Sequence, residues 1–275
     1  MAYDHRPVDG RVDLQSDRDS GDLAVNSGER TRNADGSAKP RVVVTTSWDD
    51  GHRLDSRLAE FLAEYQLPGT FYVSPRDAEF DPRDRLDDSE VVCLAQGFEI
   101  GAHTLTHPRL TRLDESAAQS EIADSKAYLE DITGRPVNSF CYPYGLFSPE
   151  HVQIVHSAGF RYARTVQRFS KGAGADPLQA PTTVHAYSHL IDIPQAIAYS
   201  KFNPVTAWDV YSHWDRLAEH LFDEVLTKGG VFHLWGHSWE IDKNKDWSAL
   251  RRVFDYISHR SGVAYVVNGD LPSVV

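Results

Sequence analysis

Short apolar runs alternate with amphipathic stretches from residue 41 onward. The run at 42–46 is apolar and β-branched, which predicts a buried strand. Residues 55–65 then place apolar side chains at the spacing of one helix face, and Leu67-Pro68-Gly69 ends that helix. We predict strands at 42–46, 70–73, 98–102, 137–141, 160–165, 230–234 and 263–267, and helices at 55–65, 89–96, 114–132, 148–159, 207–227 and 247–259. This alternation predicts one α/β domain built on a parallel sheet or a (β/α) barrel.

Two regions lack the alternation. Residues 1–40 are dominated by Asp, Arg, Ser, Gly and Asn, with too little apolar surface to offset the entropy cost of ordering. We therefore predict a disordered polar tail ahead of a domain at 41–275. Residues 166–205 are rich in Gly, Pro and Thr. Because a loop of that length is unusual in a compact domain, we predict that it faces the substrate.

The composition argues against some classes of function. The chain has 275 residues and a formal net charge of -12, and an acidic surface disfavours nucleic acid as a partner. No run of about 18 apolar residues occurs, so we expect no membrane span. The polar N-terminus lacks the apolar segment of a secretory signal, so we expect a cytoplasmic protein.

Polar clusters follow the predicted strands. They lie where apolar runs end, at 49–50, 103–107, 142–145, 164–165 and 235–237. The C-terminal ends of parallel barrel strands share one face, and active sites are built on that face. We therefore expect these residues, far apart in the sequence, to converge in space.

Asp49 and Asp50 are adjacent carboxylates followed by Gly51. Adjacent strand residues point to opposite faces of a sheet, so a regular strand cannot direct both carboxylates to one site. A turn just past the strand end can do so, and Gly51 permits it. We predict that one Asp binds a metal and the other handles protons, and spacing alone leaves open which does which. An Asx turn or a helix cap is the structural alternative.

Histidine pairs four residues apart are candidates for the other metal ligands. The chain contains 13 histidines, so chance alone gives roughly 0.6 such pairs and one pair is a weak signal. The pairs present are His103/His107, His185/His189 and His233/His237. At a strand end, residues four apart can face the same way, which favours the pair at 103 and 107. The pair at 185 and 189 lies in the irregular region, where the sequence assigns no geometry.

One carboxylate oxygen and two imidazole nitrogens suit a catalytic divalent metal, Zn²⁺ before others, because three protein ligands leave a position open for water. Such an ion lowers the pKa of the water and polarises a carbonyl. The second carboxylate would then accept the proton of the water, and His237 would protonate the leaving group.

Five sequence blocks occur in an order that matches a known family. They are Thr46-Ser47-Trp48-Asp49-Asp50-Gly51, Gly69-Thr70-Phe71-Tyr72-Val73, His103-Thr104-Leu105-Thr106-His107, Tyr142-Pro143-Tyr144-Gly145 and Leu234-Trp235-Gly236-His237. With these blocks, residues 41–267 resemble the polysaccharide deacetylases of carbohydrate esterase family four, the NodB-like family. The resemblance implies a distorted (β/α) barrel and metal-dependent hydrolysis of N-acetyl or O-acetyl groups on sugars.

The resemblance also implies roles for individual residues. Asp49 looks like the general base and His237 like the general acid. Asp50, His103 and His107 look like the metal ligands.

Two further roles come from the same resemblance. The backbone N–H of Tyr144 looks like the donor that stabilises the oxyanion. Leu234 resembles the residue that lines the pocket for the acetyl methyl group.

Two departures from the family pattern stand out. The family often has an arginine, paired with the catalytic Asp, where this chain has Cys141. It often has an Asp after the next strand that orients the catalytic His, and none occurs there in this chain. We hypothesise that Arg164 supplies the missing positive charge beside Asp49, and the partner of His237 remains open.

The predicted function is removal of acetyl groups from a sugar, an oligosaccharide or a glycan biosynthetic intermediate. A cytoplasmic location would favour a soluble or lipid-linked intermediate over a cell-wall polymer. One alternative is an amidohydrolase of the same fold that opens a small cyclic amide or imide. Another is a carbohydrate-binding relative without activity. The presence of both Asp residues and both His residues favours the first.

Overall fold

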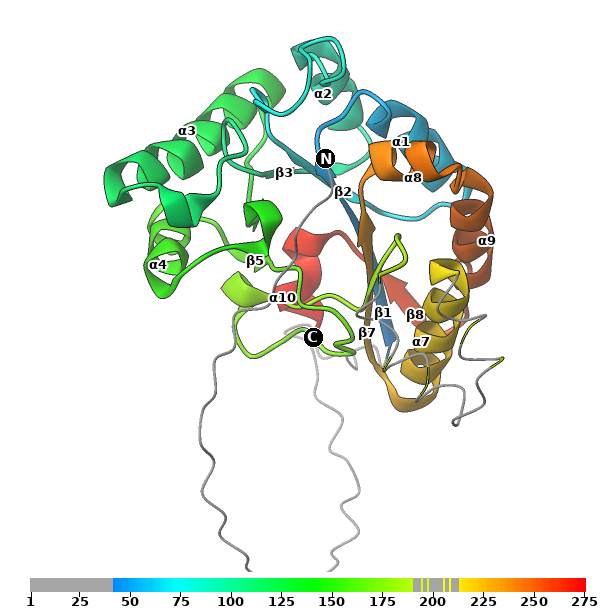
Figure 1. The fold of residues 1–275 in the computed structure, drawn as a ribbon. Helices are drawn as coiled ribbons and strands as arrows, with labels where there is room; N and C mark the ends of the chain where they lie inside the picture. Colours follow the sequence, from blue (N-terminus) through cyan, green and yellow to red (C-terminus); the bar gives the residue numbers. More distant parts are fainter. Residues whose placement is uncertain (1–41, 190–193, 195–196, 198–204, 206–207, 209–212) are drawn as a thin grey trace, which may run out of the picture. The chain divides into compact units, whose positions relative to one another are not determined.

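The computed structural model describes residues 42–189, 194, 197, 205, 208 and 213–275, and these fall within one compact unit, 32–275 (Figure 1). Their eight strands form one parallel sheet. The strands are β1 (Val42–Asp50), β2 (Thr70–Val73), β3 (Glu99–Ala102), β4 (Ser139–Cys141), β5 (Tyr162–Arg164), β6 (Val184–His185), β7 (Gly230–Gly236) and β8 (Val263–Tyr265). Their order is β5-β4-β3-β2-β1-β7-β6, and β8 also pairs with β1. The predicted tail, 1–40, lies outside the described residues.

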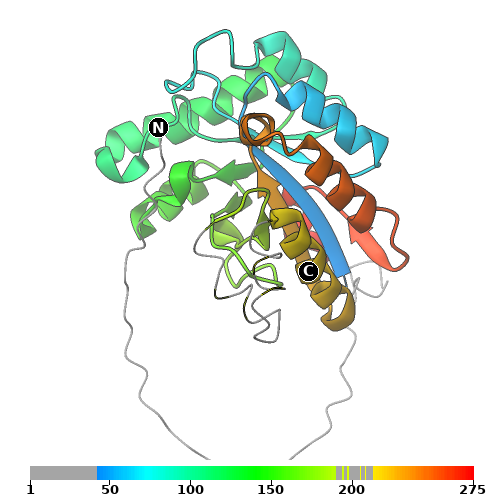
Figure 2. The same ribbon diagram turned by 45° about the vertical axis from the view of Figure 1, so that its right-hand side comes forward.

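Helices lie around this sheet (Figures 1 and 2). They are α1 (Asp55–Glu64), α2 (Asp88–Leu94), α3 (Glu115–Thr133), α4 (Pro149–Ser157), α7 (Trp214–Lys228), α8 (Ser238–Asn244), α9 (Trp247–Ile257) and α10 (Leu271–Val274). Local signals set their ends, as in α3, where the Asp114 side chain accepts the N–H of Ala117 and Gly134 adopts the left-handed conformation at the other end. In the described part of the chain, no helix combines the length and the apolar character that a bilayer crossing requires.

The gap between the edge strands β5 and β6 is bridged irregularly. Arg164 at the end of β5 forms an isolated parallel bridge with Ala180. Thr183, just before β6, donates its N–H to the carbonyl oxygen of His233 in β7. The parallel sheet therefore curls into a distorted (β/α) barrel, and the predicted fold class is confirmed.

The predicted elements are present, with changed ends and three additions. Strands β1 and β7 run further than expected, to Asp50 and Gly236. The short elements β6, α8 and α10 were not predicted. The predicted helix at 207–227 begins partly outside the described residues, and its described part is α7. The predicted substrate-facing loop at 166–205 also lies partly outside them.

Strand β1 separates a polar interior from an apolar exterior. On its outer side, Trp48 meets the ring of Phe254 in α9 edge-on at 6.0 Å. On its inner side, Ser47 Oγ lies 2.8 Å from His233 Nε2. Because strand residues alternate between faces, Asp49 also faces inward. The same alternation that builds the core thus delivers Asp49 to the inside of the barrel.

The segment after β8 closes the other end of the barrel interior. Asn268 accepts a hydrogen bond from Thr45 Oγ1 at 2.8 Å and donates one to Tyr72 Oη at 2.9 Å. Gly269 donates its N–H to Glu99 at 3.0 Å. These buried polar groups satisfy one another, as groups removed from water must.

Candidate active site

Both carboxylates at the end of β1 face one site. We expected a turn after a shorter strand, and this was wrong, because Asp49 and Asp50 are the last residues of β1. The alternation is broken at Asp50 itself, which has φ of 82°, and Gly51 follows with φ of 73°. A Cβ on Gly51 would lie 2.8 Å from Val73 Cγ1, so the turn requires glycine. His237 Nε2 consequently lies 4.0 Å from Asp49 Oδ2 and 3.9 Å from Asp50 Oδ2.

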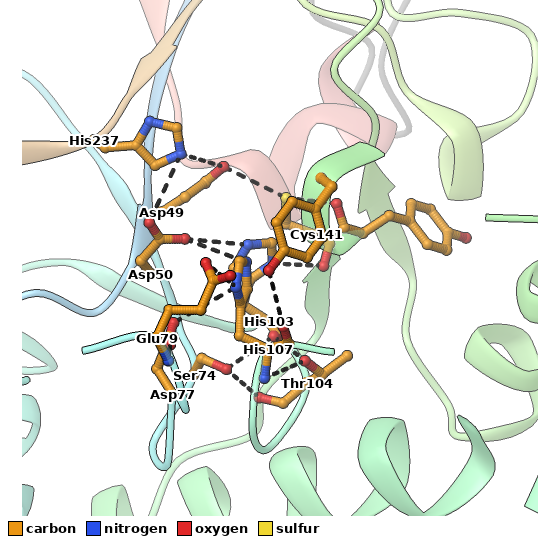
Figure 3. A network of polar contacts seen from close by, with 12 residues as sticks. Asp49, Asp50, Ser74, Asp77, Glu79, His103, Thr104, His107, Cys141 and His237 are labelled. Atoms are coloured by element: carbon orange, nitrogen blue, oxygen red, sulfur yellow. Dashed lines mark hydrogen bonds and ion pairs between the residues drawn. The ribbon is translucent and has the colours of Figure 1, made fainter. Parts of the chain in front are cut away.

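Asp50, His103 and His107 form a compact group (Figure 3). The Nε2 atoms of both histidines lie 3.5 Å from Asp50 Oδ1. All three side chains are buried. The structure therefore brings together the three residues that the sequence nominated as metal ligands.

The loop that carries the two histidines is held from outside. Ser74 Oγ donates to the carbonyl oxygens of His103 at 3.1 Å and Thr104 at 3.0 Å (Figure 3). Glu121 in α3 accepts from the N–H of Thr106 at 2.9 Å and from its hydroxyl at 2.7 Å. These bonds fix the loop between β3 and α3, so the spacing of the two imidazoles depends on backbone that is anchored on two sides.

Hydrogen bonding fixes the tautomer of His103. Its Nδ1 lies 2.7 Å from the carbonyl oxygen of Cys141, which can only accept, so Nδ1 carries the proton. The lone pair of Nε2 then faces Asp50. Burial lowers the pKa of His103, which keeps the imidazole neutral. A neutral imidazole with its outer nitrogen bonded to a carbonyl is the form in which histidine binds metals.

The donor set fits a small divalent cation. A tetrahedral zinc site with bonds of about 2.0 to 2.1 Å places its ligand atoms about 3.3 Å apart. The observed separations of 3.5 Å between Asp50 Oδ1 and each histidine Nε2 match that geometry. Although burial alone would raise the pKa of Asp50, the charge of His237 and the contact with His103 hold it well below its usual range. Asp50 is therefore an anion, as a ligand carboxylate must be.

Further side chains surround these ligands. Trp239 Nε1 donates to Asp50 Oδ2 at 2.8 Å and leaves Oδ1 facing the histidines. His107 Nδ1 lies 3.7 Å from Asp77 Oδ2 and 3.6 Å from Glu79 Oε2 (Figure 3). Groups in such positions orient ligating side chains and raise their affinity for a metal. The sequence analysis did not predict any of these three contacts.

Arg164 forms an ion pair with Asp49. Its Nη2 donates to both carboxylate oxygens, and the Arg164 side chain is 0% exposed. Burial alone would raise the pKa of Asp49, but the guanidinium holds it below its ordinary value. Cys141 is the register partner of Arg164 across β4 and β5, and its Sγ lies 3.6 Å from Asp49 Oδ2. Arg164 in β5 thus supplies the positive charge beside Asp49 that the sequence lacks at position 141 in β4.

His237 has a carboxylate partner that the sequence analysis missed. Its Nδ1 lies 2.5 Å from Glu240 Oε2. Burial alone would lower the pKa of His237, but the Glu240 carboxylate raises it to about 10. His237 precedes α8 and Glu240 lies in its first turn, so a His-x-x-Glu spacing at a strand end was the available signal.

Tyr144 lies beside the histidine loop. It adopts φ of 58° within a tight turn, Pro143–Gly145. Its ring centroid lies 4.7 Å from that of His107, and the guanidinium of Arg109 lies 4.4 Å from the ring centroid. The expected position of Tyr144 at the site is therefore observed, and its role in stabilising an oxyanion stays a prediction.

Leu234 does not lie where the sequence analysis expected it. It is completely buried in the main hydrophobic cluster, on the face of β7 opposite to that of its neighbour Trp235. Trp235 is the residue that faces the site. Its ring lies 4.5 Å from the guanidinium carbon of Arg164 and 5.7 Å from the ring of His237. The strand alternation counted back from His237 gives position 235, a signal that the sequence analysis overlooked.

The other two histidine pairs now have positions. His233 lies inside the barrel against Ser47, away from the three metal-ligand candidates. His185, in β6, lies 3.2 Å from Glu240 Oε2 through its Nε2. The irregular region thus places the buried His185 beside Glu240, on the Nδ1 side of His237. No sequence pattern indicated this contact.

Comparisons with known proteins show what the sequence is similar to. Residues 36–163 match the family described as polysaccharide deacetylase. A peptidoglycan-N-acetylmuramic acid deacetylase of Bacillus subtilis is 28% identical over 110 residues, 39% of this chain and 22% of that protein. A chitooligosaccharide deacetylase of Azorhizobium caulinodans is 30% identical over 121 residues, 43% of this chain and 55% of that protein. The matched regions thus span about half, or less, of these relatives.

A solved structure shows the same fold. The family 4 carbohydrate esterase from Streptomyces lividans superimposes with a TM-score of 0.51 at 15% sequence identity, covering 81% of this chain and 90% of that one. At this identity the likeness concerns the fold alone. The matched segment at residues 36–163 confirms the resemblance inferred from the five sequence blocks, and the chain is similar to the polysaccharide deacetylases.

Proposed function

We propose that the protein is a metal-dependent hydrolase that removes an acetyl group from a sugar, an oligosaccharide or a glycan biosynthetic intermediate. The observation that carries this proposal is that the Nε2 atoms of His103 and His107 each lie 3.5 Å from Asp50 Oδ1, with Asp49 and His237 beside them. Asp50, His103 and His107 would hold the metal, for which Zn²⁺ is our first choice. When bound there, the ion supplies a Lewis acid that polarises the acyl carbonyl.

Asp49 serves as the general base. Its low pKa, held down by Arg164, keeps it ionised at neutral pH and ready to accept a proton from the attacking water. Because Arg164 contacts both carboxylate oxygens, it also fixes the direction of the carboxylate. The guanidinium cannot itself take the proton, since arginine stays charged in proteins.

His237 serves as the general acid. The contact with Glu240 keeps its imidazole protonated, so Nε2 has a proton to donate on the side of Asp49 and Asp50. Water adds to the acyl carbon, the C–N bond breaks, and the leaving nitrogen takes the proton from His237. The products are acetate and an amine, or an alcohol when the acetyl group is O-linked.

The tight turn at Tyr144 supports a third role. Its backbone N–H is a fixed dipole near the histidine loop, and such donors stabilise the charge that develops on the carbonyl oxygen. The partly exposed rings of Tyr144 and Trp239 lie around the same residues and offer flat surfaces against which the C–H faces of a sugar can pack.

The decisive experiment measures bound metal and acetate release in parallel. Purified protein is assayed for metal by elemental analysis and for acetate release from N-acetylated and O-acetylated sugars, including soluble and lipid-linked intermediates. Asp49→Asn and His237→Ala are expected to lower turnover at least about 100-fold each. Asp242→Asn, an exposed change in α8, is the matched control and should leave turnover unchanged.

Two outcomes would count against the proposal. Bound metal without acetate release from any substrate would favour hydrolysis of a different C–N bond, such as that of a cyclic amide. Neither metal nor hydrolysis would favour a carbohydrate-binding protein.

A further inference from the structure

The side of His237 that faces away from Asp49 is covered by residues from α8 and β6. Nδ1 of His237 lies 2.5 Å from Glu240 Oε2, while Nε2 faces Asp49 and Asp50. Because His237 immediately precedes α8, a residue three positions later returns to the same side of the helix. The local sequence His-Ser-Trp-Glu therefore builds this contact within one helical turn.

A second histidine holds Glu240. His185 Nε2 lies 3.2 Å from the same Oε2 atom, at an angle outside that of a regular hydrogen bond. The ring of His185 is buried and stacks on Trp235, with centroids 3.9 Å apart and planes 7° from parallel. Its Nδ1 shares a 2.7 Å hydrogen bond with His189 Nε2. The stack and the hydrogen bond leave the ring of His185 a single orientation.

The charges of these groups are consistent with one another. Burial lowers the pKa of His185 to about 4, so this ring is neutral at pH 7. Burial alone would raise the pKa of Glu240, but the charge of His237 holds it below its ordinary value. A neutral His185 that accepts a hydrogen bond from His189 at Nδ1 carries its own proton at Nε2 and presents that N–H to the Glu240 carboxylate. The arrangement is a charged pair of His237 and Glu240 backed by a neutral donor.

We infer that Glu240 and His185 are positioning residues for the general acid. Glu240 holds the His237 ring in the tautomer and direction that aim Nε2 at the leaving group, and His185 holds Glu240 in place. A carboxylate on the far nitrogen of a catalytic histidine has this effect in hydrolases. The inference rests on the proposed function, because it concerns the residue that protonates the leaving group.

A metal ion is the competing occupant of this cluster. His185, His237 and Glu240 lie close enough to hold one. However, the two imidazoles converge on a single Glu240 oxygen, and the 2.5 Å contact with His237 already has the length of a strong charge-assisted hydrogen bond. The cluster therefore favours a proton over a cation between its members.

The first test uses two substrates that differ in their need for an acid. An amide nitrogen leaves only with a proton, whereas 4-nitrophenolate leaves without one. Glu240→Gln is expected to lower kcat about 100-fold or more on an N-acetyl amino sugar and to leave KM, and hydrolysis of 4-nitrophenyl acetate, nearly unchanged. Asp242→Asn should change neither. Equal losses on both substrates, or a loss on neither, would overturn the inference.

The second test concerns His185. Gln places an amide nitrogen near the position of His Nε2, so His185→Gln is expected to retain most amide hydrolysis. His185→Leu, which removes the donor, should lower kcat and leave KM unchanged. In a His237→Ala background, the Glu240 and His185 changes should have no further effect, since residues that act through one group are not additive. Additive losses would show a merely structural role.

The third test separates this inference from the proposed function. The proton between His237 Nδ1 and Glu240 should give a proton NMR signal far downfield of the amide region in wild type and Asp242→Asn, and none in Glu240→Gln. If this signal is present but no acetylated sugar is hydrolysed, the positioning stands and the proposed function fails. If the signal is absent, or a second metal ion per chain is lost in Glu240→Gln, the inference fails.

Discussion

Arg164 reaches the carboxylate of Asp49 across the strand position held by Cys141. The two residues are register partners, Cys141 in β4 and Arg164 in β5, and the guanidinium lies fully buried against both oxygens of Asp49. The small thiol leaves the space that the long side chain crosses. The cationic partner of the proposed base thus comes from β5, one strand beyond the position held by Cys141.

Replacing Arg164 by Ala should abolish most turnover and weaken the fold. Removing one partner of a buried ion pair leaves the other charge uncompensated, so the free energy of unfolding should fall by about 3 kcal/mol or more. Urea unfolding and acetate release measure the two effects. The double variant Cys141→Arg/Arg164→Cys should recover part of the activity lost in Arg164→Cys alone. Near-normal turnover in Arg164→Ala would show that the pair is not used in catalysis.

Divalent metal should stabilise the fold through three residues. A ligand that binds only the folded state at about 100 times its Kd raises the free energy of unfolding by about 2.7 kcal/mol. We expect Zn²⁺ to have this effect on the wild type and to lose it in His107→Ala, while His156→Ala, a change at an exposed histidine, should respond like the wild type. Thermal unfolding with and without EDTA measures the difference. An equal response of both variants would place the metal elsewhere.

Trp239→Phe should weaken metal binding and leave the fold intact. The change removes the N–H that donates to Asp50 Oδ2 at 2.8 Å, and loss of such outer partners typically lowers metal affinity about 10- to 100-fold. Competition with a chromogenic chelator measures the affinity. Trp247→Phe is the matched control, because its indole N–H donates to the exposed Asp242 instead. A similar loss of affinity in both variants would contradict the assigned contact.

Alkaline pH should destabilise the metal-free protein through His237. The pKa of this group rises from 6.5 to about 10 on folding, so its stabilising contribution is fully present below pH 6.5 and is lost as the pH rises through about 10. Urea unfolding in EDTA between pH 6 and pH 10.5 should show this loss in the wild type. His237→Ala should lack that part of the pH dependence, and identical pH profiles for the two proteins would argue against the pKa shift.

The strands, and the site residues at their C-terminal ends, could be predicted from the pattern of apolar and polar residues. Apolar runs identified the strands of the barrel, and polar clusters at their ends placed the two Asp residues with His103 and His107. The family resemblance then selected Asp50 as the ligand, and the structure brings these three residues together. The end of β1 was misplaced because the apolar run stops at residue 46, whereas the strand continues through the buried polar residues Ser47, Asp49 and Asp50. The left-handed conformation of Asp50 was not evident from the sequence either.

The surroundings of the site were less accessible to sequence reasoning. Trp239 reaches Asp50 from 189 positions away, and His185 comes from a two-residue strand in an irregular region. Such contacts depend on how the barrel closes. The positions of Glu240 and Trp235 could have been predicted from the sequence. Glu240 lies three residues after His237, which is one helical turn, and Trp235 lies two residues before it, on the same face of the strand.

The pairing of β1 has a consequence for biosynthesis. This strand carries Asp49 and Asp50, which pair with the early strand β2, but the other edge of β1 pairs with β7, which a ribosome makes some 180 residues after it. One edge of β1 therefore stays unpaired until β7, late in the domain, has been translated. Contacts between such distant segments slow folding. The two carboxylates of the proposed site are synthesised early, but they can meet His237, which follows β7, only among the last events of chain maturation.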